Sequence, residues 1–263
     1  MRALIYIWMI FLGALASIDA RGEDFAAVVS PPRFEVASKP GATLRQVIEV
    51  TNRSPTPAHY RFHTADFLLG PDYGLTFHDE LLPGSCRPWV AIERSLVTLP
   101  PGGTIRYRFE VQVPADAPAG ECRFAVMIEA AEPSSTQAGA VQIPIVGRIG
   151  VIVYVAVGDA APRIEIFGPE TVTHNSQRVP AVRVHNSGTA HTRMSGFLSG
   201  KDAGGRSYDF TPSDLPILPG EDRSVILTPS TPDNPTPTLT FPVSMKGTLE
   251  WADQKTDLIE IFN

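Results

Sequence analysis

The two cysteines, Cys86 and Cys122, are the residues whose chemistry depends most on where the protein resides. They lack C-x-x-C spacing, and two lone cysteines do not build a structural zinc site without further ligands. In an oxidising compartment they are expected to form a disulfide rather than to stay free thiols. That bridge closes a loop of about 36 residues, worth about 4 kcal/mol in the chain-entropy model.

The six histidines do not form a recognisable ligand pattern. His63 with Asp66, and His78 with Asp79, are the pairs that come nearest to a metal-binding arrangement. His59 lies in an alternating segment, and the strand face that carries it suits a solvated surface as well as it suits a metal site. We therefore expect no metal site and no cofactor.

No short catalytic motif occurs in the chain. It has no G-x-S-x-G elbow, Walker loop, G-x-G-x-x-G or H-E-x-x-H. The paired carboxylates of glycoside hydrolases come from distant positions, and nothing local suggests them. We predict no catalytic residue and no enzymatic activity, and the net charge of −6 gives no indication of a nucleic-acid partner.

The N-terminus, MRALIYIWMIFLGALASIDA, has the layout of a secretory signal peptide. Arg2 precedes an apolar run, and small residues follow it as in an A-x-A-like cleavage site. The alternative is an uncleaved membrane anchor, but the run is shorter than the roughly 20 residues that a span needs. We expect residues 1–20 to be a signal peptide and the mature protein to be exported without a stable membrane anchor.

The elements that carry these residues are expected to be strands. The 25 prolines and 21 glycines, without long helical stretches, favour short strands joined by turns. Two passages alternate apolar and polar residues and then continue to an asparagine, Asn52 in one and Asn186 in the other. Later in the chain, each is followed by a Leu-Pro-Gly turn that leads into another alternating strand. The matching passages are 47–62 with 181–197, and 99–114 with 218–229. This repeat predicts an all-β fold of two tandem immunoglobulin-like β-sandwich domains.

The boundary between the two domains is expected in a short run of small residues, VGDAAPRIE. We place the N-terminal domain at 31–158 and the C-terminal domain at 162–263. The C-terminal segment 247–262 predicts a hairpin that turns near Ala252.

The segment 141–157 is the least ordinary strand in the chain. Seven of its eight odd positions from Ile143 to Val157 are Ile or Val. One strand of this length spans roughly 50 Å, longer than a small sandwich needs. It is either a long buried strand, two strands joined at the glycines, or a partly exposed apolar comb that pairs with another protein. The polar stretch before it, 129–140, is expected to be a loop.

These passages resemble the PapD-like periplasmic chaperones of the chaperone–usher family, as a divergent member. The resemblance rests on PPRFEV (31–36), on 47–62, on LPPGGTIRYRFEVQVPADAPAGECRF (99–124) and on the long apolar strand. It implies a periplasmic protein without catalysis that binds pilin-like or other surface subunits, and an outer-membrane usher as a further partner.

In that family, a long strand donates alternate apolar side chains into an incomplete subunit. The resemblance places Arg33 as the cleft arginine that holds the subunit's terminal carboxylate. The family's cleft lysine has no match at 158–161, and Arg148 or Arg163 are its candidate replacements. The donor residues would come from Ile143, Ile145, Ile149, Val151 and Val153.

An alternative is an exported immunoglobulin-like module that binds the envelope or the cell surface without chaperone activity. Such proteins share the VPADAPAGE turn and a GRIGVIVYV-like strand. For this alternative the apolar comb should be paired entirely within the protein.

Overall fold

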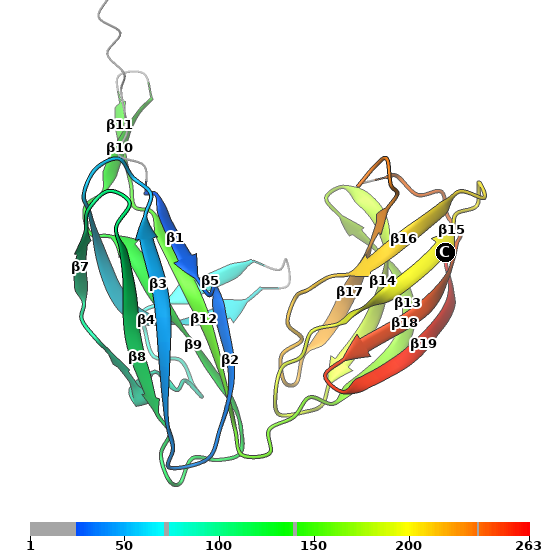
Figure 1. The fold of residues 1–263 in the computed structure, drawn as a ribbon. Coiled ribbons are helices and arrows are strands. Elements are labelled where there is room, and N and C mark those ends of the chain that lie inside the picture. The colour runs from blue at the N-terminus through cyan, green and yellow to red at the C-terminus, as the bar shows by residue number, and fades with distance from the viewer. Residues whose placement is uncertain (1–24, 71–73, 139–140, 236) are drawn as a thin grey trace, which may run out of the picture.

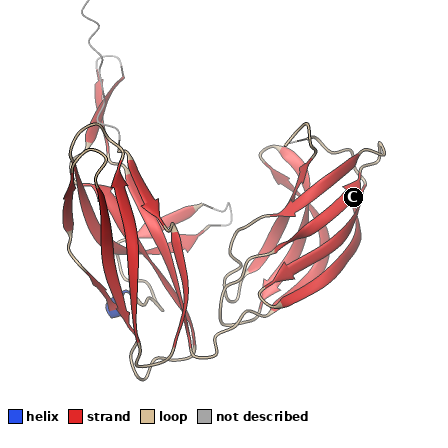
Figure 2. Cartoon of the chain, in the orientation of Figure 1, coloured by secondary structure: helices blue, strands red, loops and turns tan. Residues whose placement is uncertain are grey.

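The computed structural model describes residues 25–70, 74–138, 141–235 and 237–263. In this part of the chain the only helix is the short 3-10 turn η1 (Arg87–Trp89), and all other regular elements are strands. The strands form two β-sandwich modules in sequence order (Figures 1 and 2). The predicted all-β fold class is confirmed, whereas the predicted signal peptide lies outside the described residues.

The first module packs two sheets face to face. One sheet has the order β1 (Ala27–Ser30), β3 (Thr43–Asn52), β8 (Thr104–Gln112), β6 (Val90–Ile92). The other has the order β2 (Arg33–Ser38), β12 (Arg148–Val157), β9 (Gly120–Ala130), β4 (Ala58–Leu69), β5 (Leu75–His78), with β7 (Leu96–Leu99) beside β4. Because β1 pairs with β3, the first module begins before residue 31.

The core of the first module follows from the period-two alternation of its strands. Ile48 and Val50 of β3 point inward and are fully buried, as are Tyr107 and Phe109 of β8. From the opposite sheet, the ring of Phe62 stacks on that of Tyr107 with centroids 3.8 Å apart. Each buried aromatic of this size contributes a large share of the apolar area that holds a sandwich together.

The segment 141–157 is two strands and not one. β11 (Val141–Ile145) pairs with β10 (Ser134–Ala138) in a separate two-stranded ribbon, and β12 starts at Arg148. At the break, a Cβ on Gly147 would lie 2.2 Å from the Cβ of Phe25, so no larger residue fits there. The alternative of two strands joined at the glycines is therefore correct. The loop prediction for 129–140 is wrong at 129–130, which end β9, and at 134–138, which form β10, and its last two residues lie outside the described residues. The β10–β11 ribbon projects from the end of the module (Figure 1).

The second module is a single curved sheet of seven strands around its own core. Its order is β13 (Ile164–His174), β14 (Gln177–Asn186), β17 (Asp222–Ser230), β16 (Ser207–Pro212), β15 (Ser195–Lys201), β18 (Val243–Trp251), β19 (Gln254–Phe262). The predicted C-terminal hairpin is confirmed as β18 and β19, with Ala252 in the left-handed turn region at φ 45°.

The two asparagines that revealed the repeat have the same structural role in both modules. Asn52 and Asn186 are fully buried. The Asn52 Nδ2 donates to the carbonyls of Thr56 (2.8 Å) and Leu99 (3.2 Å). The Asn186 Nδ2 donates to those of Ala190 and Ile217, both at 2.9 Å. Each asparagine thus ties the turn after its own strand to the segment that enters the Leu-Pro-Gly turn, which explains why both motifs recur together.

Candidate functional site

The residues predicted to face a partner are divided by the structure into exposed and buried groups. Ile143 and Ile145 of β11 are 44% and 47% exposed, and Ile149 is half-buried. Val151 and Val153 are fully buried in the core of the first module, because alternate residues of β12 point into the sandwich. Their burial removes these two valines from the set that a partner can contact.

β12 is paired unequally on its two edges. It pairs with β9 along its whole length, from Arg148 to Val157. It pairs with β2 in parallel only from Ile152 onward. Among the strands that the structure describes, none pairs with the β2-side edge of 148–151. These residues carry backbone donors and acceptors at the edge of a sheet, the arrangement that β-strand addition uses.

Arg33 lies where the open edge of β12 ends. It is the first residue of β2 and stands opposite Ile152 in the register. Its side chain is partly exposed and forms an ion pair with Glu35 through Nε, at 2.9 Å. Two of the predicted binding residues, Arg33 of β2 and Ile149 of β12, therefore lie beside the open edge of β12. The other two, Ile143 and Ile145 of β11, lie beyond the break at Gly147.

The outer face of β12 is covered by the end of the β4–β5 hairpin. β4 leaves β9 after Ala65, and Phe77 of β5 then reaches across the sheet to Gly150. A Cβ on Gly150 would lie 2.4 Å from the Phe77 Cζ, so glycine permits this close contact. The guanidinium of Arg148 lies 5.9 Å from the centre of the Phe77 ring, within cation–π range. Arg148 is thus engaged at the outer face and does not lie beside Arg33.

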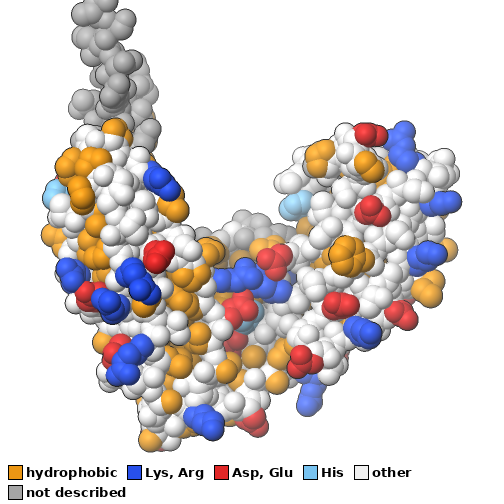
Figure 3. Space-filling view, in the orientation of Figure 1, with side chains coloured by type: hydrophobic (Ala, Val, Ile, Leu, Met, Phe, Trp, Pro, Cys, Tyr) orange, Lys and Arg blue, Asp and Glu red, His pale blue; other side chains and the backbone are white. Residues whose placement is uncertain are grey.

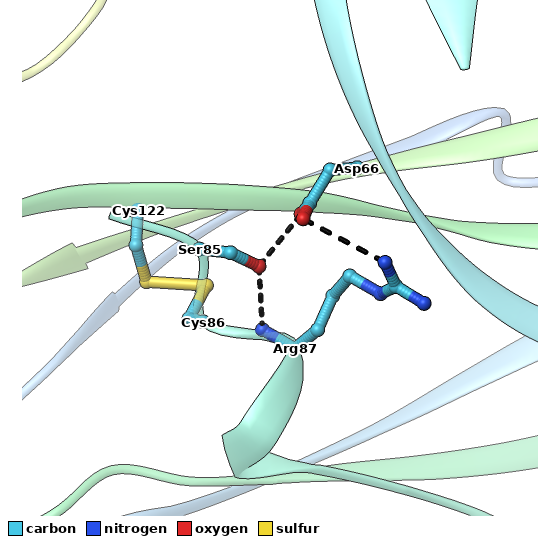
Figure 4. Close-up of a disulfide and its surroundings, with 5 residues drawn as sticks. All are labelled: Asp66, Ser85, Cys86, Arg87 and Cys122. Carbon is cyan, nitrogen blue, oxygen red and sulfur yellow. Dashed lines mark hydrogen bonds and ion pairs between the residues drawn. A yellow bond between two sulfur atoms is a disulfide. The ribbon is translucent and has the colours of Figure 1, made fainter. Parts of the chain in front are cut away.

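The predicted disulfide between Cys86 and Cys122 is confirmed, with a Cα–Cα distance of 5.6 Å. It fastens the segment after β5 to the start of β9 (Figure 4). Next to it, the buried carboxylate of Asp66 accepts hydrogen bonds from the Ser85 hydroxyl (2.6 Å) and forms an ion pair with Arg87 (3.6 Å). Asp66, considered above with His63 as a metal ligand, therefore has a structural role here.

Charged side chains gather where the two modules meet, and the surface is hollowed there (Figure 3). We call the following seven residues the junction cluster. Its members are Arg33 and Glu35 of β2, Glu121 of β9, Tyr154 of β12, and His191, Arg193 and Asp214 of the second module. Only Arg33 was predicted from the sequence, because a local pattern does not show which segments of the two modules come together.

The most buried contact of the junction cluster is between His191 and Glu121, whose side chains are 6% and 3% exposed. The His191 Nδ1 donates to the Glu121 Oε2 at 2.6 Å, and the backbone N–H of His191 donates to the same oxygen. The imidazole also stacks on the Tyr154 ring with centroids 3.8 Å apart. Burial raises the pKa of Tyr154 to about 12, so its hydroxyl stays neutral. This contact joins β9 and β12 to the second module.

Glu35 is the hub of the more exposed side of the junction cluster. The Arg193 Nε donates to its Oε1 at 3.3 Å, and the His191 Nε2 lies 3.5 Å away. Burial on its own raises the pKa of this carboxyl, but the nearby His191, Arg33 and Arg193 together lower the pKa below its ordinary value. Glu35 is therefore ionised at neutral pH and is balanced by cations from both modules.

Neither Arg148 nor Arg163, the two candidates for the second cation of the expected carboxylate anchor, has an interaction with Arg33 or its partner Glu35 among the described contacts. Arg148 contacts Phe77, and Arg163 precedes β13, where its backbone N–H donates to Asn186. Arg193 is the basic residue that the structure brings near Arg33, through their shared partner Glu35. The sequence does not point to Arg193, because it belongs to the second module and meets Glu35 only in the folded protein.

No group of three or more His, Cys, Asp or Glu side chains is arranged to hold a metal ion in the described residues. Across the described residues, no helix has the length and apolar character that a membrane span needs. A hollow of about 910 Å³ lies on the second module, away from the junction cluster, and its lining includes Lys201, Asp209 and Lys246.

Comparisons with known proteins give structural likeness only. No protein-family model matches the sequence, and no curated protein matches it. A solved structure described as a chaperone–tip adhesin complex of CFA/I fimbriae is similar, with 13% identity and a TM-score of 0.48, covering 90% of this chain and 98% of that chain. The E. coli chaperone DraB is similar at 12% identity and a TM-score of 0.47, covering 91% and 97%. The CsuC–CsuE chaperone–tip adhesion subunit complex of Acinetobacter baumannii has 9% identity and a TM-score of 0.46, covering 89% and 97%.

Proposed function

We propose that this protein is a periplasmic assembly chaperone that holds a pilin-like surface subunit by adding a strand to it. The proposal requires no catalysis and no cofactor. An outer-membrane usher is the second partner that it implies, as the acceptor of the subunit. The expected signal peptide would deliver the chain to the periplasm, where the Cys86–Cys122 bridge can form.

The observation that carries the proposal is the half-open edge of β12. The backbone of 148–151 has a ladder partner only on its β9 side among the described strands. A subunit strand that paired there would extend the sheet by main-chain hydrogen bonds, and apolar side chains beside the edge would fill the subunit's groove. Ile149 lies on this edge, and Ile143 and Ile145 of the separate β10–β11 ribbon precede the break with exposed side chains.

Arg33 supports the same arrangement at the other end of the edge. It stands opposite Ile152, where the pairing of β12 with β2 begins. The side chain of Arg33 is 43% exposed, so a terminal carboxylate from the subunit can reach its guanidinium. A charge-assisted hydrogen bond between arginine and a carboxylate is among the stronger single contacts available to hold a chain end.

The alternative is an envelope-binding module without chaperone activity. It predicts that the alternating Ile and Val residues of 143–157 are all paired within the protein. Val151 and Val153 fit that description because both are fully buried. The backbones of Ile143 and Ile145 are paired with β10, but their side chains fit it less well, since nearly half of each residue is exposed. The exposed isoleucines therefore favour the chaperone proposal.

Substitution of the exposed isoleucines tests the proposal. The variant with Ile143→Asp and Ile145→Asp is co-expressed with pilin-like subunits, and subunit capture is measured by co-purification against the wild type. We expect capture to fall about ten-fold or more, because an ionised side chain is costly to bury in an apolar groove. Ile259→Asp is the matched control, since Ile259 is 81% exposed on β19 of the second module. Capture that survives the double substitution would contradict strand addition.

A further inference from the structure

Arg33 presents two different ends of its guanidinium to two acids. Its Nε is 2.9 Å from the Oε1 of Glu35, a residue on the same face of β2. Its Nη1 points toward the second module and is 3.6 Å from the Oδ2 of Asp214. The Nε contact fixes the plane of the guanidinium, so the Nη end is the part left to bind another carboxylate.

Asp214 reaches this place from the connection between β16 and β17. The Nη1 of Arg193 donates a hydrogen bond to the Asp214 carbonyl, and this contact holds the backbone of the connection beside β2. The Asp214 carboxylate itself is 3.9 Å from the same arginine nitrogen. The backbone of Asp214 is therefore anchored, while its carboxylate lies between two arginines.

The carboxylate of Asp214 holds this place only weakly. Its side chain is 71% exposed. The separations of 3.6 and 3.9 Å exceed the 2.7–2.9 Å or so of a charge-assisted hydrogen bond. Exposed ion pairs of this kind contribute little free energy, because water and salt screen them. A carboxylate that hydrogen-bonds directly to the Arg33 Nη atoms has the stronger contact and can displace it.

We propose that Asp214 is an internal competitor for the carboxylate site at Arg33 and thereby sets the affinity of the junction for a subunit's terminal carboxylate. The inference rests on the proposed function, since it takes the ligand to be a chain end with a free carboxylate. Asp214 supplies the same functional group at the same guanidinium, from the opposite module. Its charge lowers the affinity for the ligand and protects Arg33 from unrelated small anions.

This competition also couples binding to the contact between the modules. Displacing Asp214 breaks one ion pair that joins the modules, whereas the Glu121–His191 and Glu35–Arg193 contacts remain. Because linkage is reciprocal, removal of the Asp214 charge and binding of a carboxylate favour each other. The modules stay joined while one of their contacts is exchanged.

The experiment compares two probes on the full mature chain. One is a short N-acetylated peptide of alternating valine and serine with a free terminal carboxylate, and the other is the same peptide with a terminal amide. Binding of both is measured by calorimetry or fluorescence for the wild type, Asp214→Asn, Arg33→Ala and the control Asp209→Asn. Asp209 is an exposed acid of β16 that lines the hollow on the second module, away from Arg33.

We expect Asp214→Asn to bind the carboxylate peptide about two- to five-fold more tightly, the range set by the small energy of an exposed ion pair. Binding of the amide peptide should not change, and Asp209→Asn should match the wild type with both probes. Arg33→Ala should weaken binding of the carboxylate peptide by about ten-fold or more, because a hydrogen bond to a charged group is lost.

Two other outcomes would overturn the inference, and they are distinguishable. If the wild type prefers the carboxylate to the amide and needs Arg33, but Asp214→Asn binds as the wild type does, Asp214 is not a competitor and the proposed function stands. If the wild type binds both peptides equally and Arg33→Ala has no effect, the carboxylate anchor itself fails, and the competitor role of Asp214 fails with it.

Discussion

At the scale of single residues, Asn52 and Asn186 show how one side chain can specify a module. Each is an amide buried without contact to water, and each bonds the backbone on both sides of a turn. Their Oδ1 atoms also accept backbone N–H groups, from Ser54 and Gly188. The sequence shows that both asparagines precede a Leu-Pro-Gly strand entry, but only the fold shows their burial and their hydrogen bonds to the segment that enters that turn.

Replacing either asparagine by alanine should destabilise its own module. Asn52→Ala and Asn186→Ala each leave several buried backbone groups without a partner, at a cost of about 1–3 kcal/mol. Denaturant unfolding followed by hydrogen exchange measures which module is affected. Gln112→Ala, which removes an exposed amide at the end of β8, serves as the control. An equal loss of protection in both modules after one substitution would contradict the assignment of each asparagine to one module.

At the scale of elements, the covering of β12 determines which of its atoms a partner can reach. The core occupies one face of β12, and the β4–β5 hairpin covers part of the other face through Phe77. β2 pairs with one edge of β12 from Ile152 to Val157. A partner can still reach the edge of β12 at 148–151 and the exposed side chains of β11. The alternation of Ile and Val in the sequence fits any of these surroundings, since period two defines two faces without saying what lies against them.

The disulfide is expected to maintain the position of this hairpin as well as overall stability. Paired substitution Cys86→Ala with Cys122→Ala should lower the free energy of unfolding by about 4 kcal/mol in the chain-entropy model. Hydrogen exchange should also become faster in β5 and in the segment to η1, which the bridge ties to β9. Exchange in β14 and β17 of the second module is the internal control. Unchanged exchange in β5 would show that Asp66 and Arg87 hold the hairpin without the bridge.

At the scale of the whole molecule, the two modules are joined by a short connection and by the junction cluster. β12 ends at Val157 and β13 begins at Ile164, and no strand ladder joins the modules in the described residues. The predicted division at 158–162 therefore remains the proposed domain boundary. Four ion pairs and the stacking of His191 on Tyr154 join the modules in the arrangement of Figure 1.

The Glu121–His191 contact should be the strongest of these links because both side chains are buried. In a double-mutant cycle of Glu121→Ala and His191→Ala, we expect a coupling free energy of about 1–3 kcal/mol. Each single variant should also increase proteolysis of the connection and the radius of gyration in solution scattering. The His185–Asp222 pair lies within the second module and is more exposed, so Asp222→Asn is the control. Scattering that is identical for all variants would show that other contacts fix the arrangement of the modules.

The sequence by itself determined the features that depend on a local residue pattern, and also the disulfide, for which only one pair of cysteines exists. Alternation and turn residues determined the all-β class, the recurrence of Asn and Leu-Pro-Gly determined the two modules, and the presence of only two cysteines left one possible disulfide. These features follow from the chain's own periodicity and chemistry, so they need no knowledge of what packs where.

Only the tertiary structure decided which residues of the apolar comb are exposed and what surrounds Arg33. Ile143 and Ile145 share their alternation with Val151 and Val153, yet the break at Gly147 places one pair on a projecting ribbon and the other in the core. The junction cluster joins residues far apart in the chain and from both modules, such as Arg33 and Asp214. Contacts between distant segments depend on how sheets and modules pack, and a local pattern carries no information about that packing.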